Sequence, residues 1–169
     1  MKINTKAKRA AVLGLFGALA AVISAAESAL PPLPFMPPGA KLGLSNILLM
    51  YRVKEVGLPY ALAVAIFKSA VVLLTRGVTA AMMSIAGGVL SLLAVYLIYR
   101  LRAIGSVGLG VISAVFHNLG QLAVSLVIAG GAVIYYLPAL MLFAVSTGAV
   151  TGIALHYLIK PINKVINGG

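Results

Sequence analysis

The chain has 169 residues, of which 62% are hydrophobic and 9% are charged, and its formal net charge is +11. Soluble domains carry about 25% charged residues, so this composition indicates an integral membrane protein. In a soluble protein the net charge would suggest nucleic-acid binding. Here the basic residues fall between apolar runs, so they report orientation in a membrane, and no nucleic-acid partner is expected.

Acidic residues are limited to Glu27 and Glu55, and cysteine is absent. Two carboxylates cannot build a two-metal phosphoryl-transfer centre, a Walker-type ATPase or an aspartate-rich prenyl-diphosphate synthase site. No phosphate loop of the GxxxxGK[ST] type occurs either. His117 and His156 have no carboxylate or thiolate nearby in sequence, so no metal site or other cofactor is expected. The chain is therefore predicted not to be an enzyme.

Six apolar segments follow one another along the chain, and a membrane-spanning helix needs about 20 apolar residues. The first segment could be a signal peptide, but its apolar run is longer than such peptides usually have, so we favour a retained helix. The second is short for a full crossing, which indicates a tilted or partly re-entrant helix. Pro161 is expected to end the sixth. After a basic leader at 1–9, the predicted helices cover about 10–30, 42–51, 59–74, 79–99, 106–129 and 134–159.

Six crossings would place both termini on the same side of the membrane. Ten of the thirteen basic residues fall on that side, whereas Lys41 and Arg76 fall on the other and Lys68 lies within a helix. Because cytoplasmic loops are enriched in Lys and Arg, both termini are predicted to be cytoplasmic. The expected fold is an all-α integral membrane protein, a six-transmembrane-helix bundle that forms one domain over residues 1–169.

An external proline-rich loop is predicted at residues 31–41, between Glu27 and the second helix. It contains five prolines. Proline lacks an N–H and fixes φ, so the first helix must stop before this loop. The loop could form a lid over a pocket or a simple hairpin connection, and the sequence leaves both interpretations open.

Ionisable side chains within the apolar segments are candidate binding residues, because a charge inside a membrane is costly unless it is paired or hydrated. By the predicted topology, Glu27, Lys41 and Lys68 could converge in the outer half of the bundle. Two lysines facing one glutamate favour an anionic ligand. A structural ion pair between Glu27 and either lysine is the alternative.

A second polar group lies in the segment His117-Asn118-Leu119-Gly120-Gln121. His117 and Gln121 are four residues apart and share a helix face. These side chains could contact a ligand, or they could form interhelical hydrogen bonds that fix packing. The predicted substrate-binding residues are Glu27, Lys41, Asn46, Lys68, His117, Asn118 and Gln121.

Small residues form two ridges on the first helix, each with a spacing of four. Such ridges allow another helix to approach closely. Packing within the bundle explains one ridge, so the other is predicted to meet a partner protein. The first ridge consists of Ala10, Gly14 and Ala18, and the second of Gly17, Ala21, Ala25 and Ala29.

Five segments stand out: ESALPPLP at 27–34, PGAKLGLSNI at 38–47, AGGVLS at 86–91, HNLGQ at 117–121 and YYLP at 135–138. Together they resemble the bacterial Gx transporter family, often labelled heptaprenyl diphosphate synthase component I. The scarcity of acidic residues argues against that enzymatic label. The family is similar to the S components of energy-coupling factor (ECF) transporters, which places the protein in a prokaryotic plasma membrane.

The resemblance implies a six-helix, S-component-like subunit that captures a small, anionic or amphipathic solute from outside. It implies a transmembrane coupling protein and two ATPase subunits as partners, beside membrane lipid. Ala10, Gly14 and Ala18 match the coupling-protein interface, with Gly14 departing from the alanine pattern. Family members are also associated with flavin-dependent electron transfer. A non-transporting membrane subunit of a flavin- and quinone-linked extracellular electron-transfer system is therefore the alternative, and a structural scaffold is a third.

The segment Thr147-Gly148-Ala149-Val150-Thr151 is similar to the stretch where some redox membrane subunits carry covalent FMN. It departs from that pattern at its first and fourth positions and lacks the usual upstream aspartate. Small-residue helix packing is therefore the favoured interpretation of this segment.

Overall fold

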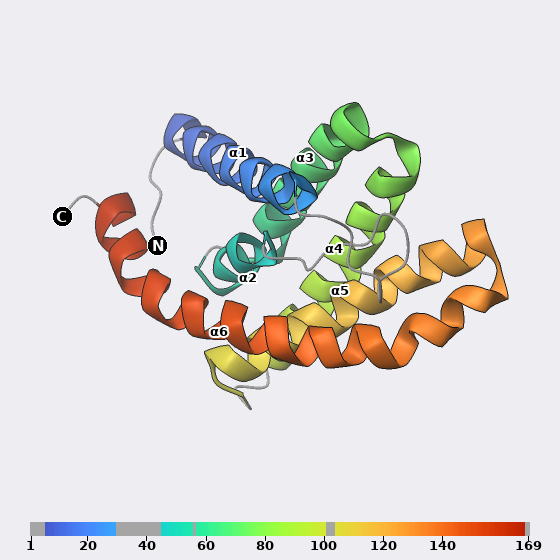
Figure 1. The fold of residues 1–169 in the computed structure, drawn as a ribbon. Coiled ribbons are helices and arrows are strands. Elements are labelled where there is room, and N and C mark those ends of the chain that lie inside the picture. The colour runs from blue at the N-terminus through green and yellow to red at the C-terminus, as the bar shows by residue number, and fades with distance from the viewer. Residues whose placement is uncertain (1–5, 30–44, 56, 101–103, 168–169) are drawn as a thin grey trace.

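A computed structural model gives the chain as a set of packed helices (Figure 1). It describes residues 6–29, 45–55, 57–100 and 104–167. No strand occurs among these residues, and the all-α class is confirmed. In chain order the helices are α1 (Lys6–Ala29), α2 (Asn46–Glu55), α3 (Leu58–Arg76), α4 (Val78–Arg100), α5 (Ser106–Ala129), the 3₁₀ helix η1 (Gly131–Tyr136) and α6 (Leu137–Asn167).

The last predicted helix differs most from the observed one. A 3₁₀ helix, η1, precedes α6 where one continuous α-helix was expected. The prediction that Pro161 ends the helix is wrong, because α6 continues through this residue to Asn167. Proline removes one helical hydrogen bond, but its φ of about −65° is compatible with a helix, so the bonds on either side can carry the helix past it.

Glycines with positive φ allow the tight turns at the ends of α3 and α5. The φ angle is 83° at Gly77 and 82° at Gly130, a region in which a residue with a β-carbon is strained. The N–H group of Gly77 donates to the carbonyl of Leu73, and that of Gly130 donates to the carbonyl of Leu126, both at 3.1 Å. These bonds satisfy carbonyls that the helix ends would otherwise leave exposed.

Within the described residues, four helical segments are long and apolar enough to cross a membrane: Leu58–Arg76, Val78–Tyr99, Ser106–Ala129 and Gly131–Lys160. The apolar part of α1 is shorter, Leu13–Glu27. α2 has 10 residues, and at about 1.5 Å per residue it reaches roughly half-way across a bilayer core. The short second element is confirmed, whereas the six crossings and the cytoplasmic termini stay predictions.

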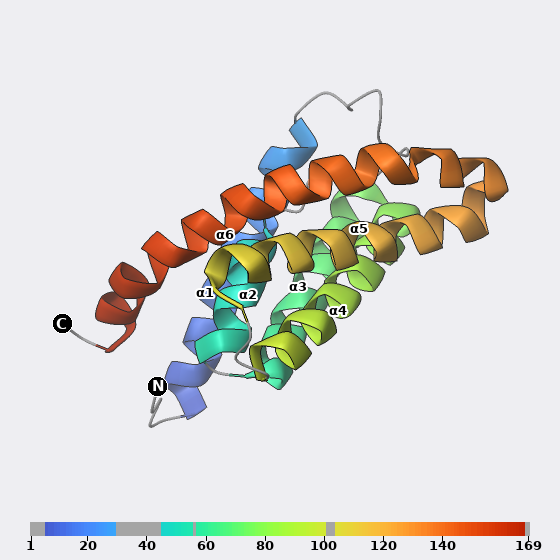
Figure 2. The ribbon, with the colours of Figure 1, turned by 90° about the horizontal axis from the view of Figure 1, so that it is seen from below.

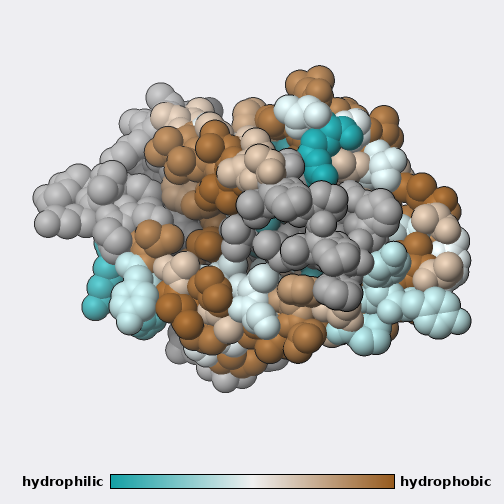
Figure 3. Space-filling view, viewed as in Figure 1, coloured by the Kyte–Doolittle hydropathy of each residue, from teal (hydrophilic) through white to brown (hydrophobic). Residues whose placement is uncertain are grey.

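Large apolar side chains on the outer faces of the long helices fit contact with lipid. Leu74, Val127 and Leu142 are 86%, 84% and 70% exposed. Hydrophobic residues cover much of the described surface in Figure 3. Such a surface is unfavourable in water, and it is typical of a protein whose surroundings are hydrocarbon. The chain is a membrane protein.

The long helices pack in chain order, α3 against α4, α4 against α5 and α5 against α6, while α1 lies on α3. The start of α1 and the end of α6 lie at the same end of the molecule in both ribbon views (Figures 1 and 2). α2 contacts all five other α-helices. Its successive residues Leu48, Leu49 and Met50 are all buried. Successive side chains of a helix point in different directions, so α2 has neighbours on several sides and lies within the core.

Buried hydrogen bonds link consecutive long helices. Such bonds, together with close packing of small residues, hold membrane helices together because the hydrophobic effect does not act between helices in lipid. The hydroxyl of Ser69 in α3 donates to that of Ser84 in α4 at 3.1 Å. Ser91 in α4 and Ser113 in α5 share a bond of 2.8 Å. Nδ2 of Asn118 in α5 donates to the carbonyl of Leu140 in α6 at 3.1 Å.

Glycines bring the backbones of α5 and α6 into direct contact. A β-carbon at Gly148 would lie 2.5 Å from Cα of Val111, and one at Gly152 would lie 2.6 Å from Cα of Val107. Thr151 is buried, and its hydroxyl donates to the carbonyl of Gly148 at 3.0 Å. Gly148 and Thr151 of this segment therefore serve helix packing, the interpretation that the sequence favoured.

Candidate functional site

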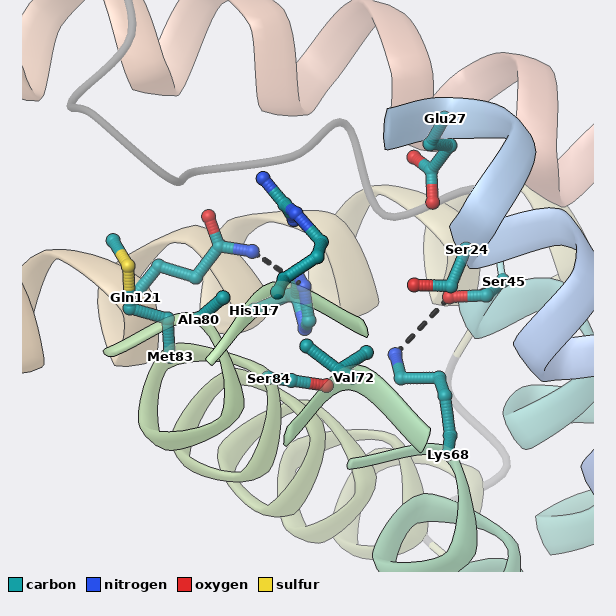
Figure 4. A pocket seen from close by; sticks show the side chains of 11 residues that line it. Ser24, Glu27, Ser45, Lys68, Val72, Ala80, Met83, Ser84, His117 and Gln121 are labelled. Atoms are coloured by element: carbon teal, nitrogen blue, oxygen red, sulfur yellow. Dashed lines mark hydrogen bonds between the residues drawn. The ribbon is translucent and has the colours of Figure 1, made fainter. Parts of the chain in front are cut away.

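A pocket lies between α1, α3, α4 and α5, beside the start of α2 (Figure 4). It measures about 290 Å³, a volume that includes the part open to the outside. The lining residues are Ser24, Glu27, Ser45, Lys68, Val72, Arg76, Ala80, Met83, Ser84, His117 and Gln121.

Helical periodicity brings these side chains to one space. Lys68, Val72 and Arg76 follow one another at a spacing of four on α3, and His117 and Gln121 have the same spacing on α5. Residues four apart lie on one face of a helix, so each helix turns a single stripe toward the pocket. The helices are apolar apart from a few residues, and the polar side chains on these facing stripes line the same pocket.

Lys68 forms one end of the pocket and is only 2% exposed. Its Nζ donates to the hydroxyl of Ser45 at 3.0 Å. The carboxylate of Glu27 interacts with it electrostatically, and Figure 4 shows Glu27 at the same end of the pocket as Ser24 and Ser45. A buried ammonium is costly unless it is paired and hydrogen-bonded, and these partners explain why the bundle can hold one.

His117 and Gln121 lie on the other side of the pocket from Lys68 (Figure 4). Nε2 of Gln121 lies 2.8 Å from Nε2 of His117. This contact is a hydrogen bond in which the imidazole nitrogen donates or accepts according to the tautomer of the ring. Both side chains are almost fully buried. The pair presents a fixed set of hydrogen-bonding groups to the pocket.

Two glycines allow α4 and α5 to meet behind this pair. A β-carbon at Gly87 would lie 2.7 Å from Nδ1 of His117. One at Gly120 would lie 2.7 Å from the carbonyl carbon of Ala86. The AGGVLS and HNLGQ segments, distant in sequence, therefore lie in contact, and their glycines let the imidazole pack directly on the backbone of α4.

A family model described as heptaprenyl diphosphate synthase component I matches residues 16–158. The chain belongs to this family. It is the Gx transporter family that the sequence resembles, and the matched range contains every described residue that lines the pocket. Comparisons with curated proteins and with solved structures found no match.

In this Gx transporter family protein, four of the predicted binding residues line the same pocket: Glu27, Lys68, His117 and Gln121. They come from three helices, and together they can bind a polar or charged molecule. Binding of a ligand by these residues stays a prediction.

Of the remaining predicted residues, Asn46 and Asn118 do not line this pocket. The side chain of Asn118 donates a hydrogen bond to the carbonyl of Leu140 in α6. For this residue the structure therefore shows interhelical hydrogen bonding, the alternative to ligand contact that the sequence left open. Asn46 is buried at the start of α2, and its neighbour Ser45 lines the pocket in its place. Lys41 and the proline-rich loop 31–41 lie outside the described residues.

Arg76 is the charged lining residue that the sequence prediction missed. Its charge was used only as a marker of membrane orientation. The available signal was its spacing of eight from Lys68, through Val72, which puts all three on one face of α3. Ser24, Ser45 and Ser84 also line the pocket, but serine is common in membrane-helix packing and carries little signal by itself.

The ridge predicted to meet a coupling protein is exposed. Ala10, Gly14 and Ala18 all lie on the surface of α1. Among the residues that the structure describes, no atom would lie within 4 Å of a β-carbon at Gly14. The second ridge begins at Gly17, which is buried and faces the ring of Phe67, 2.6 Å from where a β-carbon would be. Internal packing thus uses the Gly17 end of the second ridge, whereas its Ala25 and Ala29 are exposed. Contact of the first ridge with a partner stays a prediction.

Proposed function

We propose that this protein is the substrate-binding, S-component-like subunit of an ECF-type uptake transporter in a prokaryotic plasma membrane. It binds a small anionic or amphipathic solute and catalyses no reaction itself. The observation that carries the proposal is the convergence of Glu27, Lys68, His117 and Gln121 on one pocket. Charged and hydrogen-bonding groups within a membrane protein are costly, and a pocket lined by them is typical of a solute site.

Family membership supports the transport class, because the matched family resembles S components of ECF transporters. The chain has two acidic residues and no phosphate loop, so the energy for uptake has to come from partners. We propose a transmembrane coupling protein with two ATPase subunits. The exposed ridge of Ala10, Gly14 and Ala18 supports contact with the coupling protein through α1.

Mass spectrometry of the small molecule that co-purifies with the full-length protein in lipid nanodiscs tests the proposal. Lys68→Ala and His117→Ala are expected to reduce the bound fraction at least about tenfold, because each removes a charged or hydrogen-bonding group from a desolvated site. Ser146→Ala is the control, since this exposed hydroxyl of α6 bonds within its own helix. Wild-type amounts of the compound in both pocket variants would show that the pocket is not the solute site.

The same preparation separates the electron-transfer alternative. Quinone or flavin absorbance in the purified protein, without solute uptake when it is combined with the coupling protein and ATPases, would favour a redox subunit over a transporter.

A further inference from the structure

We propose that Arg76 binds the charged group of the solute, and that the solute is a small organic monoanion with an apolar body. The inference rests on the proposed function and deepens it, because it names a binding residue and a substrate class.

Two cations line the pocket, Lys68 and Arg76, and Lys68 already has partners within the protein. Lys68 already donates to Ser45 at 3.0 Å and interacts electrostatically with Glu27. Within the part of the chain that the structure describes, Glu27 is the sole carboxylate lining the pocket. One carboxylate balances one of the two cations, Lys68 and Arg76, so the lining formed by the described residues keeps a single positive charge. Since Glu27 interacts with Lys68, that charge belongs to Arg76.

Arg76 is more exposed to the outside than Lys68. Lys68 and Val72 are 2% and 4% exposed, whereas Arg76, two turns from Lys68 at the end of α3, is only half-buried. Eight residues span about 12 Å of a helix, so the backbones of Lys68 and Arg76 lie about two turns apart along the pocket. The side chain of Arg76 is the more exposed of the two, so a solute that enters the pocket from outside reaches Arg76 before Lys68. A guanidinium can grip a carboxylate with two parallel hydrogen bonds, which an ammonium cannot do.

The pocket also has apolar walls. The pocket is lined by three apolar side chains of α3 and α4 that are almost fully buried, Val72, Ala80 and Met83. Buried apolar walls favour an apolar surface on the ligand. A compound with one anionic group and a small apolar body therefore matches both the residual charge and the walls.

Benzoate and benzamide test the inference, because they share a ring and differ in charge. We would titrate both into the full-length protein in nanodiscs by isothermal calorimetry. Benzoate is expected to bind at least about tenfold more tightly than benzamide, and Arg76→Gln to remove this difference by weakening benzoate alone. Arg76→Lys is expected to keep part of the preference for benzoate, because it keeps the positive charge but loses the paired N–H donors of the guanidinium. Lys160→Gln, which removes an exposed cation of α6, is the matched control and should change neither titration.

The inference is overturned if Arg76→Gln binds benzoate as the wild type does. It is equally overturned if the wild type binds benzoate no better than benzamide, including binding neither. Thermal unfolding of each variant checks that the fold is kept, and Arg76→Lys supplies the answer if Arg76→Gln does not fold. An uncharged co-purifying compound that is lost from His117→Ala would leave the solute-binding function standing and reject the anion site.

Discussion

The imidazole of His117 packs on the backbone of α4 at Gly87, where a β-carbon would lie 2.7 Å from its Nδ1. Real β-carbon contacts are not this short, so a β-carbon at this position would displace the ring or the backbone of His117, whose carbonyl oxygen would lie 2.8 Å away. The contact fixes where the imidazole faces the pocket, while Gln121 holds its other ring nitrogen at 2.8 Å. The position of a candidate binding residue is thus set by a glycine of the neighbouring helix.

Replacing Gly87 is therefore expected to impair binding without touching a binding group. Gly87→Ala should push His117 out of place and reduce the co-purifying solute at least about tenfold, as expected when a buried hydrogen-bonding group is lost. Gly88→Ala is the control, because its β-carbon would lie 3.6 Å from that of Ala65, an ordinary contact. Mass spectrometry of the bound fraction compares the two. Equal retention of solute by both variants would mean that the placement of His117 does not matter for binding.

The electrostatic contact between Lys68 and Glu27 predicts coupled effects on stability. Lys68→Met and Glu27→Gln should each destabilise the protein, because each leaves a buried charge without its partner. The double variant should be more stable than the sum of the single effects predicts, with a coupling of about 0.5–3 kcal/mol. Thermal unfolding in one detergent measures the cycle. Strict additivity would show that the two charges are stabilised independently.

Backbone contact between α5 and α6 predicts that Gly110 does not tolerate a side chain. A β-carbon there would lie 2.6 Å from Cα of Gly152, and the two backbones cannot yield as a flexible side chain can. Gly110→Ala should lower stability by about 1–3 kcal/mol, the usual cost of overpacking. Gly131→Ala is the control, since no described atom would lie within 4 Å of its β-carbon. Unfolding temperatures that fall equally in both variants would contradict the prediction.

The two ridges of α1 predict different effects of the same substitution. Gly17→Leu should destabilise the isolated protein, because the new side chain must displace Phe67. Gly14→Leu should leave the isolated protein stable and block assembly with the coupling protein, because it fills an exposed groove between small residues. Thermal unfolding and co-purification with the coupling protein measure the two effects. Normal assembly of the Gly14→Leu variant would remove this ridge from the proposed interface.

The sequence by itself determined the helical class and the place of each helix to within about four residues, except at the end of α6, which continues to Asn167. Apolar runs fix which segments can lie in lipid, and glycine acts locally through its freedom of φ, as at Gly77 and Gly130. The same local reasoning failed at Pro161, because a proline weakens a helix without forbidding it. Charge within an apolar run also identified Glu27 and Lys68, because a charged side chain stands out from an apolar sequence before its partners are known.

Only the tertiary structure decided which of these residues share a pocket. Asn118 follows His117 directly, yet it points to α6 while His117 faces the pocket, because adjacent residues of a helix lie on different faces. Arg76 joins the site because the face of α3 that carries Lys68 lines the same pocket as residues of α4 and α5. Propensity and hydropathy act over a few residues, whereas the choice of packed faces depends on side chains from every helix at once. That choice is made by the whole bundle, and no single segment contains it.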